Sequence, residues 1–186
     1  MLYAQVHLTL PPWIHDAVDT EHSYAGDEAK VALAIELSRH NVDARTGGPF
    51  GAAVFGPGDR LISIGVNRVL PHSCSLAHAE TMAYMLAQQR LQTPRLNEHG
   101  GPMVLATSSQ PCCQCFGAPI WAGTARLLIG ARAEDVEALT PFDEGPLPAD
   151  WIGELNRRGI EVVRDLLRDD ARAVLQQYGE SDGGHY

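Results

Sequence analysis

The stretch "MVLATSSQPCCQCFGAP", residues 103–119, carries an apolar run directly into a proline and three closely spaced cysteines. The run from Met103 to Ser108 has the length and composition of a buried strand. If a helix begins at the cysteines, side chains three positions apart point to the same side, so Cys112 and Cys115 face together and Cys113 points elsewhere. Thiolates at a helix N-terminus are stabilised by its partial positive charge and bind metals well. The stretch therefore predicts a strand that leads into a two-cysteine metal site.

The segments on either side of this stretch alternate between helical and extended patterns. Val31, Ile35 and Val42 recur at helical spacing, and two apolar runs separated by "GPGD" predict a β-hairpin. Helices alternating with strands are typical of α/β layer folds. The pattern predicts a three-layer α/β/α fold with a central mixed sheet and helices on both faces. We expect helices over residues 27–42, 77–91, 133–139, 148–159 and 167–179, and strands over residues 50–55, 61–66, 103–108, 126–131 and 160–163.

Length and composition indicate one globular domain. The 186 residues are 45% hydrophobic, which is enough for a full core, so we expect residues 1–186 to form a single domain. Residues 1–26 mix aromatic residues with prolines and show no sustained period, which suggests an arm that packs on the domain or on a second subunit. Residues 179–186 form a C-terminal tail.

Charge and cysteine usage exclude some partners. The chain has 14 Lys and Arg against 23 Asp and Glu, a net charge of −9, and Lys30 is its single lysine. A nucleic-acid surface needs clustered basic residues, so we expect no nucleic acid as partner. The chain has no basic leader and no apolar span of about 20 residues, which predicts a soluble, cytoplasmic protein that does not enter a membrane. In that compartment crowded cysteines indicate metal or redox chemistry.

A second motif, "LAHAETMA", provides the groups that two cysteines alone do not supply. His78 opens the helix expected over residues 77–91, and Glu80 follows in its first turn, where both side chains can reach the space beyond the helix end. Two cysteines, one histidine and an open position are typical of a catalytic zinc, whose fourth ligand is a water with a pKa of about 7. The order H-x-E…P-C-x-x-C is the signature of zinc deaminases. We predict one catalytic Zn²⁺ per chain, bound by His78, Cys112 and Cys115, with Glu80 as the base beside the bound water.

At these residues the sequence resembles the cytidine deaminase superfamily and, within it, the bacterial guanine deaminase branch. The resemblance covers residues 27–186 and includes "GGPFGAAVF", "GVNRV", "AHAET", "SSQPCCQCFGAPIWAG" and "PFDEGP". The chain departs from the family at Gln110, where Glu is usual, and at Cys113 and Gln114, where Pro-Met or Val-Met is common. None of these three is a proposed ligand, so the departures concern the shape of the pocket.

The resemblance implies roles for further residues. Glu144 is implied as a second acid for proton transfer, with Asp143 as the fallback, and Asn67 as a hydrogen-bonding partner of the base. A C-terminal aromatic residue is implied to close the pocket of its own or of a partner subunit. The remaining substrate-binding residues that the resemblance implies are Phe50, Ala79, Trp121, Phe142 and, as that C-terminal aromatic, Tyr186.

The activity implied is hydrolysis of guanine to xanthine and ammonia by a homodimer, with amino-triazines such as ammeline as further substrates. A cytosine or nucleoside deaminase would use the same zinc centre with a different pocket. A tRNA-editing adenosine deaminase shares the core but needs a basic groove. Outside enzymes, the chain could be a zinc-stabilised binding domain in which Cys112 and Cys115 hold a structural metal or form a redox pair.

Overall fold

The computed structural model describes residues 2–20, 22–98 and 101–181. Within these ranges no helix is long and apolar enough to span a membrane. The α-helices are α1 (Ile14–Ala17), α2 (Asp27–Asp43), α3 (Val69–His72), α4 (Ala79–Leu91), α5 (Ala118–Ala122), α6 (Ala133–Leu139), α7 (Trp151–Asn156) and α8 (Arg168–Gly179). The strands are β1 (Gly51–Gly56), β2 (Arg60–Val66), β3 (Val104–Ser109), β4 (Arg126–Ala131) and β5 (Glu161–Val163). Short 3₁₀ turns are η1 (Pro57–Asp59), η2 (Leu96–Glu98) and η3 (Cys115–Gly117).

The strands form one mixed sheet in the order β2-β1-β3-β4-β5. β1 pairs antiparallel with both β2 and β3, whereas β3, β4 and β5 run parallel. Gly58, with a φ of 70°, lets the chain reverse between β1 and β2. Each strand lies within one residue of its predicted bounds, so the predicted mixed sheet is confirmed.

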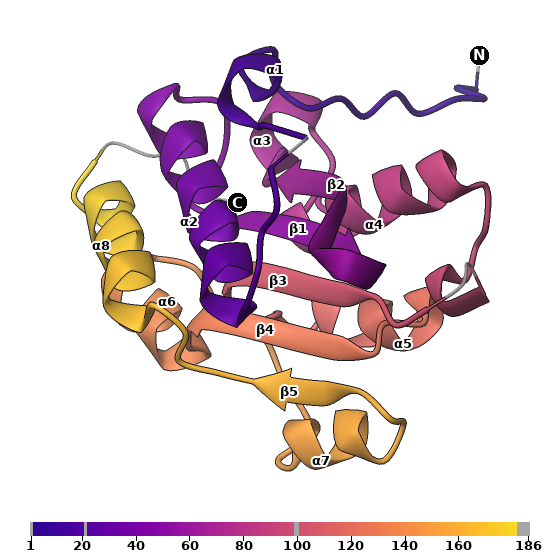
Figure 1. The fold of residues 1–186 in the computed structure, drawn as a ribbon. Helices are drawn as coiled ribbons and strands as arrows, with labels where there is room; N and C mark the ends of the chain where they lie inside the picture. Colours follow the sequence, from indigo (N-terminus) through magenta and orange to yellow (C-terminus); the bar gives the residue numbers. More distant parts are fainter. Residues whose placement is uncertain (1, 21, 99–100, 182–186) are drawn as a thin grey trace.

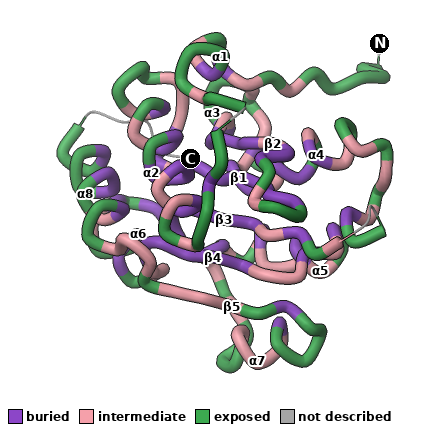
Figure 2. The backbone as a smooth tube through the Cα atoms, in the orientation of Figure 1, coloured by how far each residue is buried: buried purple, intermediate pink, exposed green. Residues whose placement is uncertain are grey.

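Helices cover both faces of the sheet, as predicted (Figure 1). α2 packs on β1 and β3 with α8 beside it, and α4 packs on β1 and β2 from the opposite face. Leu127 belongs to the core beneath α4 and the next residue, Leu128, to the core beneath α2, because successive side chains of a strand point to opposite faces. Both are fully buried, and Figure 2 shows β1, β3 and β4 as mostly buried strands in the centre of the molecule, whereas β5 at the edge of the sheet is only partly buried. Because helices cover the central strands on both faces, both sets of side chains are apolar and the strands appear in the sequence as continuous apolar runs.

A close backbone contact places the first turn of α4 on the sheet. A Cβ atom at Gly65 in β2 would overlap with the backbone carbonyl oxygen of Ala79, the first residue of α4. Only glycine allows the helix to pack so closely at this point. His78 precedes this turn and Glu80 lies within it, so the contact sets the position of both side chains relative to the sheet.

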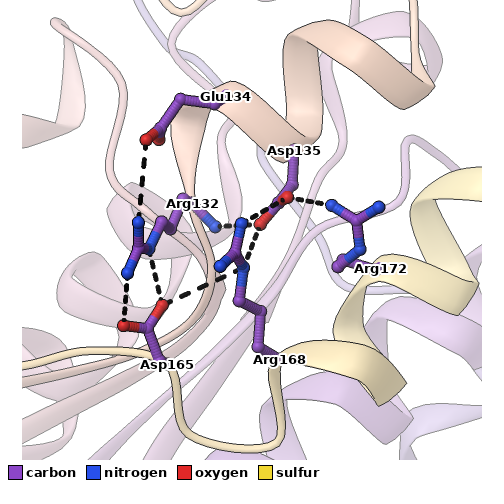
Figure 3. Close-up of polar contacts among 6 residues, drawn as sticks. All are labelled: Arg132, Glu134, Asp135, Asp165, Arg168 and Arg172. Carbon is purple, nitrogen blue, oxygen red and sulfur yellow. Dashed lines mark hydrogen bonds and ion pairs between the residues drawn. The ribbon is translucent and has the colours of Figure 1, made fainter.

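A buried aspartate joins α6 to α8 (Figure 3). Asp135, whose side chain is 2% exposed, accepts hydrogen bonds from Arg168 at 2.7 and 2.8 Å and from the backbone N–H of Arg132 at 2.9 Å. Arg172 also contacts this carboxylate, and Arg132 pairs with Asp165 at 2.7 Å. The network anchors α6, and the segment that follows α6 carries the two acids predicted for the site.

Two single-turn helices and the cysteine segment differ from the predicted pattern. α1 and α3 are too short to show a helical period in the sequence. The cysteines do not begin an α-helix: Cys115 begins η3, and α5 begins only at Ala118. The expected shared direction of Cys112 and Cys115 is nevertheless preserved, because both sulfurs lie close to His78.

Candidate active site

The predicted metal ligands meet where two helical segments begin. His78 directly precedes α4, and Cys112 and Cys115 lie between β3 and α5. Nδ1 of His78 lies 3.5 Å from Sγ of Cys112 and 3.6 Å from Sγ of Cys115, and the three ligand atoms lie within 4.8 Å of one another. Ordinary Zn–S and Zn–N bonds in a tetrahedral site separate a sulfur from a nitrogen ligand by about 3.6 Å. The donor set and its spacing therefore fit a zinc ion.

One of the two ligand thiols is readily ionised. A hydrogen bond from the Cys115 thiol lowers the pKa of Cys112 to about 4, and it does so against the opposing effect of burial. The thiolate is the form that binds a metal. Cys113 is exposed, and its sulfur lies against Gly145 and not among the ligand atoms. This placement agrees with the prediction that Cys113 points away.

Glu80 lies in the first turn of α4 and is 6% exposed. Its carboxyl group contacts the thiol of Cys115 through a hydrogen bond. Burial, and then the charge of Cys112, raises the pKa of Glu80 to about 7. A buried carboxyl that changes protonation near neutral pH beside a metal site is suited to transferring protons.

Of the two acids in "PFDEGP", Glu144 is the buried one, at 6% exposure, whereas Asp143 is exposed. Asp143 accepts a hydrogen bond from the N–H of Gly145 at 2.7 Å, which shapes the turn. The backbone oxygen of Glu144 accepts a hydrogen bond from the N–H of Cys113 at 2.9 Å, which joins this loop to the metal segment. Burial, and then nearby negative charges, raises the pKa of Glu144 to about 9.

A cavity of about 340 Å³ opens beside these groups, within the size range of small-molecule sites. Cys115 lies behind its wall, fully buried. The structure thus brings a metal site and two acids to one concave surface. The predicted residues in the wall are Phe50, Asn67, His78, Glu80, Cys112, Phe142, Asp143 and Glu144.

A row of aromatic rings runs from the cavity to α8. The ring centroids of Phe50 and Phe142 are 5.5 Å apart, and those of Phe142 and Tyr178 are 5.6 Å apart, which is the spacing of favourable ring pairs. Asn67 is buried at the wall, and its side-chain oxygen accepts a hydrogen bond from the N–H of Val69 at 3.3 Å. These contacts fix both the apolar and the polar parts of the wall.

Two predicted pocket residues, Ala79 and Trp121, do not join this wall. Ala79 is fully buried against Gly65, beneath the first turn of α4. Trp121 lies on α5 with 76% of its surface exposed, so the structure does not bring its ring to Phe50 and Phe142. Tyr186 lies outside the described residues.

The wall also contains residues to which the sequence assigned no binding role. Ser109 is the last residue of β3, Gln110 follows it directly before the metal segment, and Gln114 lies between the two ligand cysteines. Adjacency to the zinc motif is the sequence feature that could have identified them. Ser75, Cys113 and Gly145 complete the wall.

A family model described as the cytidine and deoxycytidylate deaminase zinc-binding region matches residues 25–131, a span that includes all three ligands and Glu80. The chain belongs to this family. The predicted resemblance and the predicted zinc cofactor of a deaminase are thereby confirmed.

Known relatives extend the similarity beyond the zinc region. The solved structure of guanine deaminase from Nitrosomonas europaea is 44% identical, with a TM-score of 0.90 over 97% of this chain and 100% of that chain. Guanine deaminase of Bacillus subtilis is 34% identical over 117 residues, 63% of this chain and 71% of that protein. A probable cytosine deaminase of Schizosaccharomyces pombe is 31% identical over 166 residues, 85% of this chain and 94% of that protein. The predicted fold class is confirmed by the first of these.

Proposed function

We propose that this deaminase hydrolyses guanine to xanthine and ammonia. The observation that carries the proposal is that a zinc site and two buried carboxyls, Glu80 and Glu144, border one small-molecule cavity. The similarity to the guanine deaminase of Nitrosomonas europaea, which covers nearly the whole chain, supports guanine as the base.

The proposed mechanism divides the proton transfers between two carboxyls. His78, Cys112 and Cys115 would hold the zinc ion, which would act as a Lewis acid that makes a water more acidic. Glu80 accepts the proton of the attacking water and passes it to the ring nitrogen beside the amino-bearing carbon, a task that suits a pKa of about 7. Glu144, with a pKa of about 9, holds a proton at neutral pH and donates it to the amino group as ammonia leaves. Glu80 takes up the remaining hydroxyl proton as the new carbonyl forms, and exchange with water restores both carboxyl groups.

The remaining site residues would bind the base. Phe50 and Phe142 present ring surfaces to the cavity, and Asn67 presents a fixed amide. Asp143, on the same wall, remains the fallback for the second acid. We propose that Tyr186 closes the pocket, as the family pattern implies. We also propose that the exposed Trp121 and the buried Ala79 do not contact the base themselves and affect binding only through the residues that they contact.

Ammonia release by zinc-loaded protein tests the substrate. The panel is guanine, ammeline, cytosine, cytidine, guanosine and adenine, and we expect guanine to be turned over most efficiently. Fastest release from cytosine would support the second candidate, which the similarity to the Schizosaccharomyces pombe protein favours. Release from none of them, by fully zinc-loaded protein, would contradict the enzymatic proposal.

A purely structural zinc is less consistent with the site. Such a site needs a fourth protein ligand. Within the described ranges the metal cluster consists of His78, Cys112 and Cys115, which leaves one position for a small molecule.

We propose a homodimer, and the N-terminal arm supports it. Leu2, Tyr3 and Val6 are almost fully exposed, and a groove that includes Met85 separates the arm from α4. In Figure 1 the arm extends away from the body. The first 15 residues contain no Asp, Glu, Lys or Arg, so the arm has no acidic side chain that would repel a second chain of net charge −9. A monomer at micromolar concentration in sedimentation would contradict this proposal.

We also propose that residues 1–186 act as one domain in the cytoplasm without nucleic acid as a partner. The cysteines are free of disulfides, which suits a reducing compartment, and the acidic net charge opposes binding to phosphates.

A further inference from the structure

Two buried polar atoms in the cavity wall lack a hydrogen-bond partner. They are Oγ of Ser109 and Nε2 of Gln114, and across residues 2–20, 22–98 and 101–181 no other buried side-chain nitrogen or oxygen is unpaired. Both residues line the proposed active site. Folded proteins pair nearly all buried polar side chains, because an unpaired group has lost its bonds to water without replacement. Two such atoms in one cavity indicate a ligand that completes them.

The two polar side chains that precede Ser109 in the strand are paired within the protein. Oγ of Ser108 accepts a hydrogen bond from the N–H of Gly51 at 3.1 Å, and Oγ1 of Thr107 donates to the carbonyl of Ser109 at 2.9 Å. Consecutive residues of a strand point to opposite faces, so Ser108 and Ser109 serve different sides of the sheet. Of these two serines, Ser109, which carries the unpaired hydroxyl, lines the cavity and Ser108 does not.

We propose that Ser109 and Gln114 form a binding subsite that recognises hydrogen-bond acceptors on the substrate base. The amide nitrogen of Gln114 is only a donor, and a serine hydroxyl can donate. Their complement is a carbonyl oxygen or an unprotonated ring nitrogen, and guanine carries such groups apart from the amino group that is replaced. The identity of the base that this subsite binds rests on the proposed function. That the bound molecule must present hydrogen-bond acceptors follows from the two donors alone.

The test separates a binding role from a structural one by measuring stability and affinity together. Gln114→Met keeps an unbranched side chain without the amide, and Ser109→Ala removes the hydroxyl. Removing an unpaired buried polar atom is neutral or stabilising, so both variants should melt at the same temperature as the parent or about 2–4 °C higher. Both should bind guanine about 10-fold more weakly.

Affinity is measured by calorimetry in zinc-loaded Glu80→Gln protein, in which bound guanine is not consumed. Ser108→Ala is the matched control: its hydroxyl is paired, so the variant should melt at a lower temperature and bind guanine normally. Steady-state kinetics on the variants with Glu80 intact should show a raised KM with a smaller change in kcat.

Guanine analogues identify the acceptor that each donor serves. 3-Deazaguanine and 7-deazaguanine each lack one ring-nitrogen acceptor, and 2-aminopurine lacks the carbonyl oxygen while its N1 becomes an acceptor. The 10-fold effect of Gln114→Met or Ser109→Ala should vanish for at least one of the three analogues. Equal weakening for all analogues, a loss of stability alongside affinity, or unchanged guanine affinity would overturn the subsite.

If the parent protein does not deaminate guanine, the proposed function fails separately. The same variants are then tested with the base that the panel identifies, and the same opposite changes in stability and affinity are expected.

Discussion

Replacement of Asp135 by Asn should destabilise the protein by about 2.5 kcal/mol at neutral pH. The side chain of Asp135 is buried, and hydrogen bonds from Arg168 lower the pKa of its carboxyl from about 3.8 to about 2, with the backbone N–H of Arg132 contributing (Figure 3). Each unit of pKa difference between the folded and unfolded chain is worth about 1.4 kcal/mol. Because the pKa of Asp135 is lower in the folded than in the unfolded chain, its carboxylate stabilises the fold fully at pH values above the pKa of the unfolded chain. This stabilisation is lost as the pH falls through the pKa of the folded chain.

Chemical denaturation of zinc-loaded protein measures this effect. The deficit of Asp135→Asn should be constant from about pH 8 to pH 5 and should shrink below about pH 4, where the unfolded carboxyl takes up its proton. Asp150→Asn is the matched control, because Asp150 is exposed and an asparagine can still cap α7, so it should change stability by less than about 0.5 kcal/mol. An equal loss in the two variants, or a deficit that persists undiminished at low pH, would refute this account of the network.

Four further predictions concern the site. Glu80→Ala should keep one zinc per chain, measured by atomic absorption, and lose turnover by several orders of magnitude; loss of the metal would show that Glu80 is misassigned. Glu144→Gln should slow turnover yet raise the denaturation midpoint at pH 7. A carboxyl whose pKa rises to about 9 in the folded chain must take up a proton on folding, which lowers the stability of the parent protein at pH 7, and this difference from the variant should shrink as pH falls toward 4.5. Cys112→Ser should lose zinc, whereas Cys113→Ser should retain zinc and activity; equal zinc loss would assign Cys113 to the site. Deleting residues 183–186 should lower turnover, and unchanged turnover would remove Tyr186 from the pocket.

The zinc site could be predicted from the sequence because its parts are local. His78 directly precedes the helical turn that contains Glu80, and Cys112 and Cys115 share one short segment, so spacing alone relates the members of each pair. The two segments meet because of the order of the strands and helices along the chain. The hydrophobic period of the sequence and its turn residues also predict that order.

The pocket wall could not be predicted in the same way. Whether Trp121 faces the cavity depends on where α5 begins, and the 3₁₀ turn Cys115–Gly117 occupies the positions directly before that start. The sequence also cannot show that Ser109 lacks a hydrogen-bond partner while Ser108 has one, because the difference depends on Gly51 in a neighbouring strand. Such features are set by tertiary contacts between distant residues.

The contact between Gly65 and Ala79 also affects which mutations the protein can tolerate. Gly65 has no functional group and lies on a strand, yet any side chain there would push the start of α4 away from the sheet, together with the metal ligand and the base that this turn carries. In a collection of inactivating alleles, substitutions at Gly65 should therefore be as frequent as those at the catalytic residues. A variant found there would be a defect of enzyme geometry, even though the altered residue never meets the substrate.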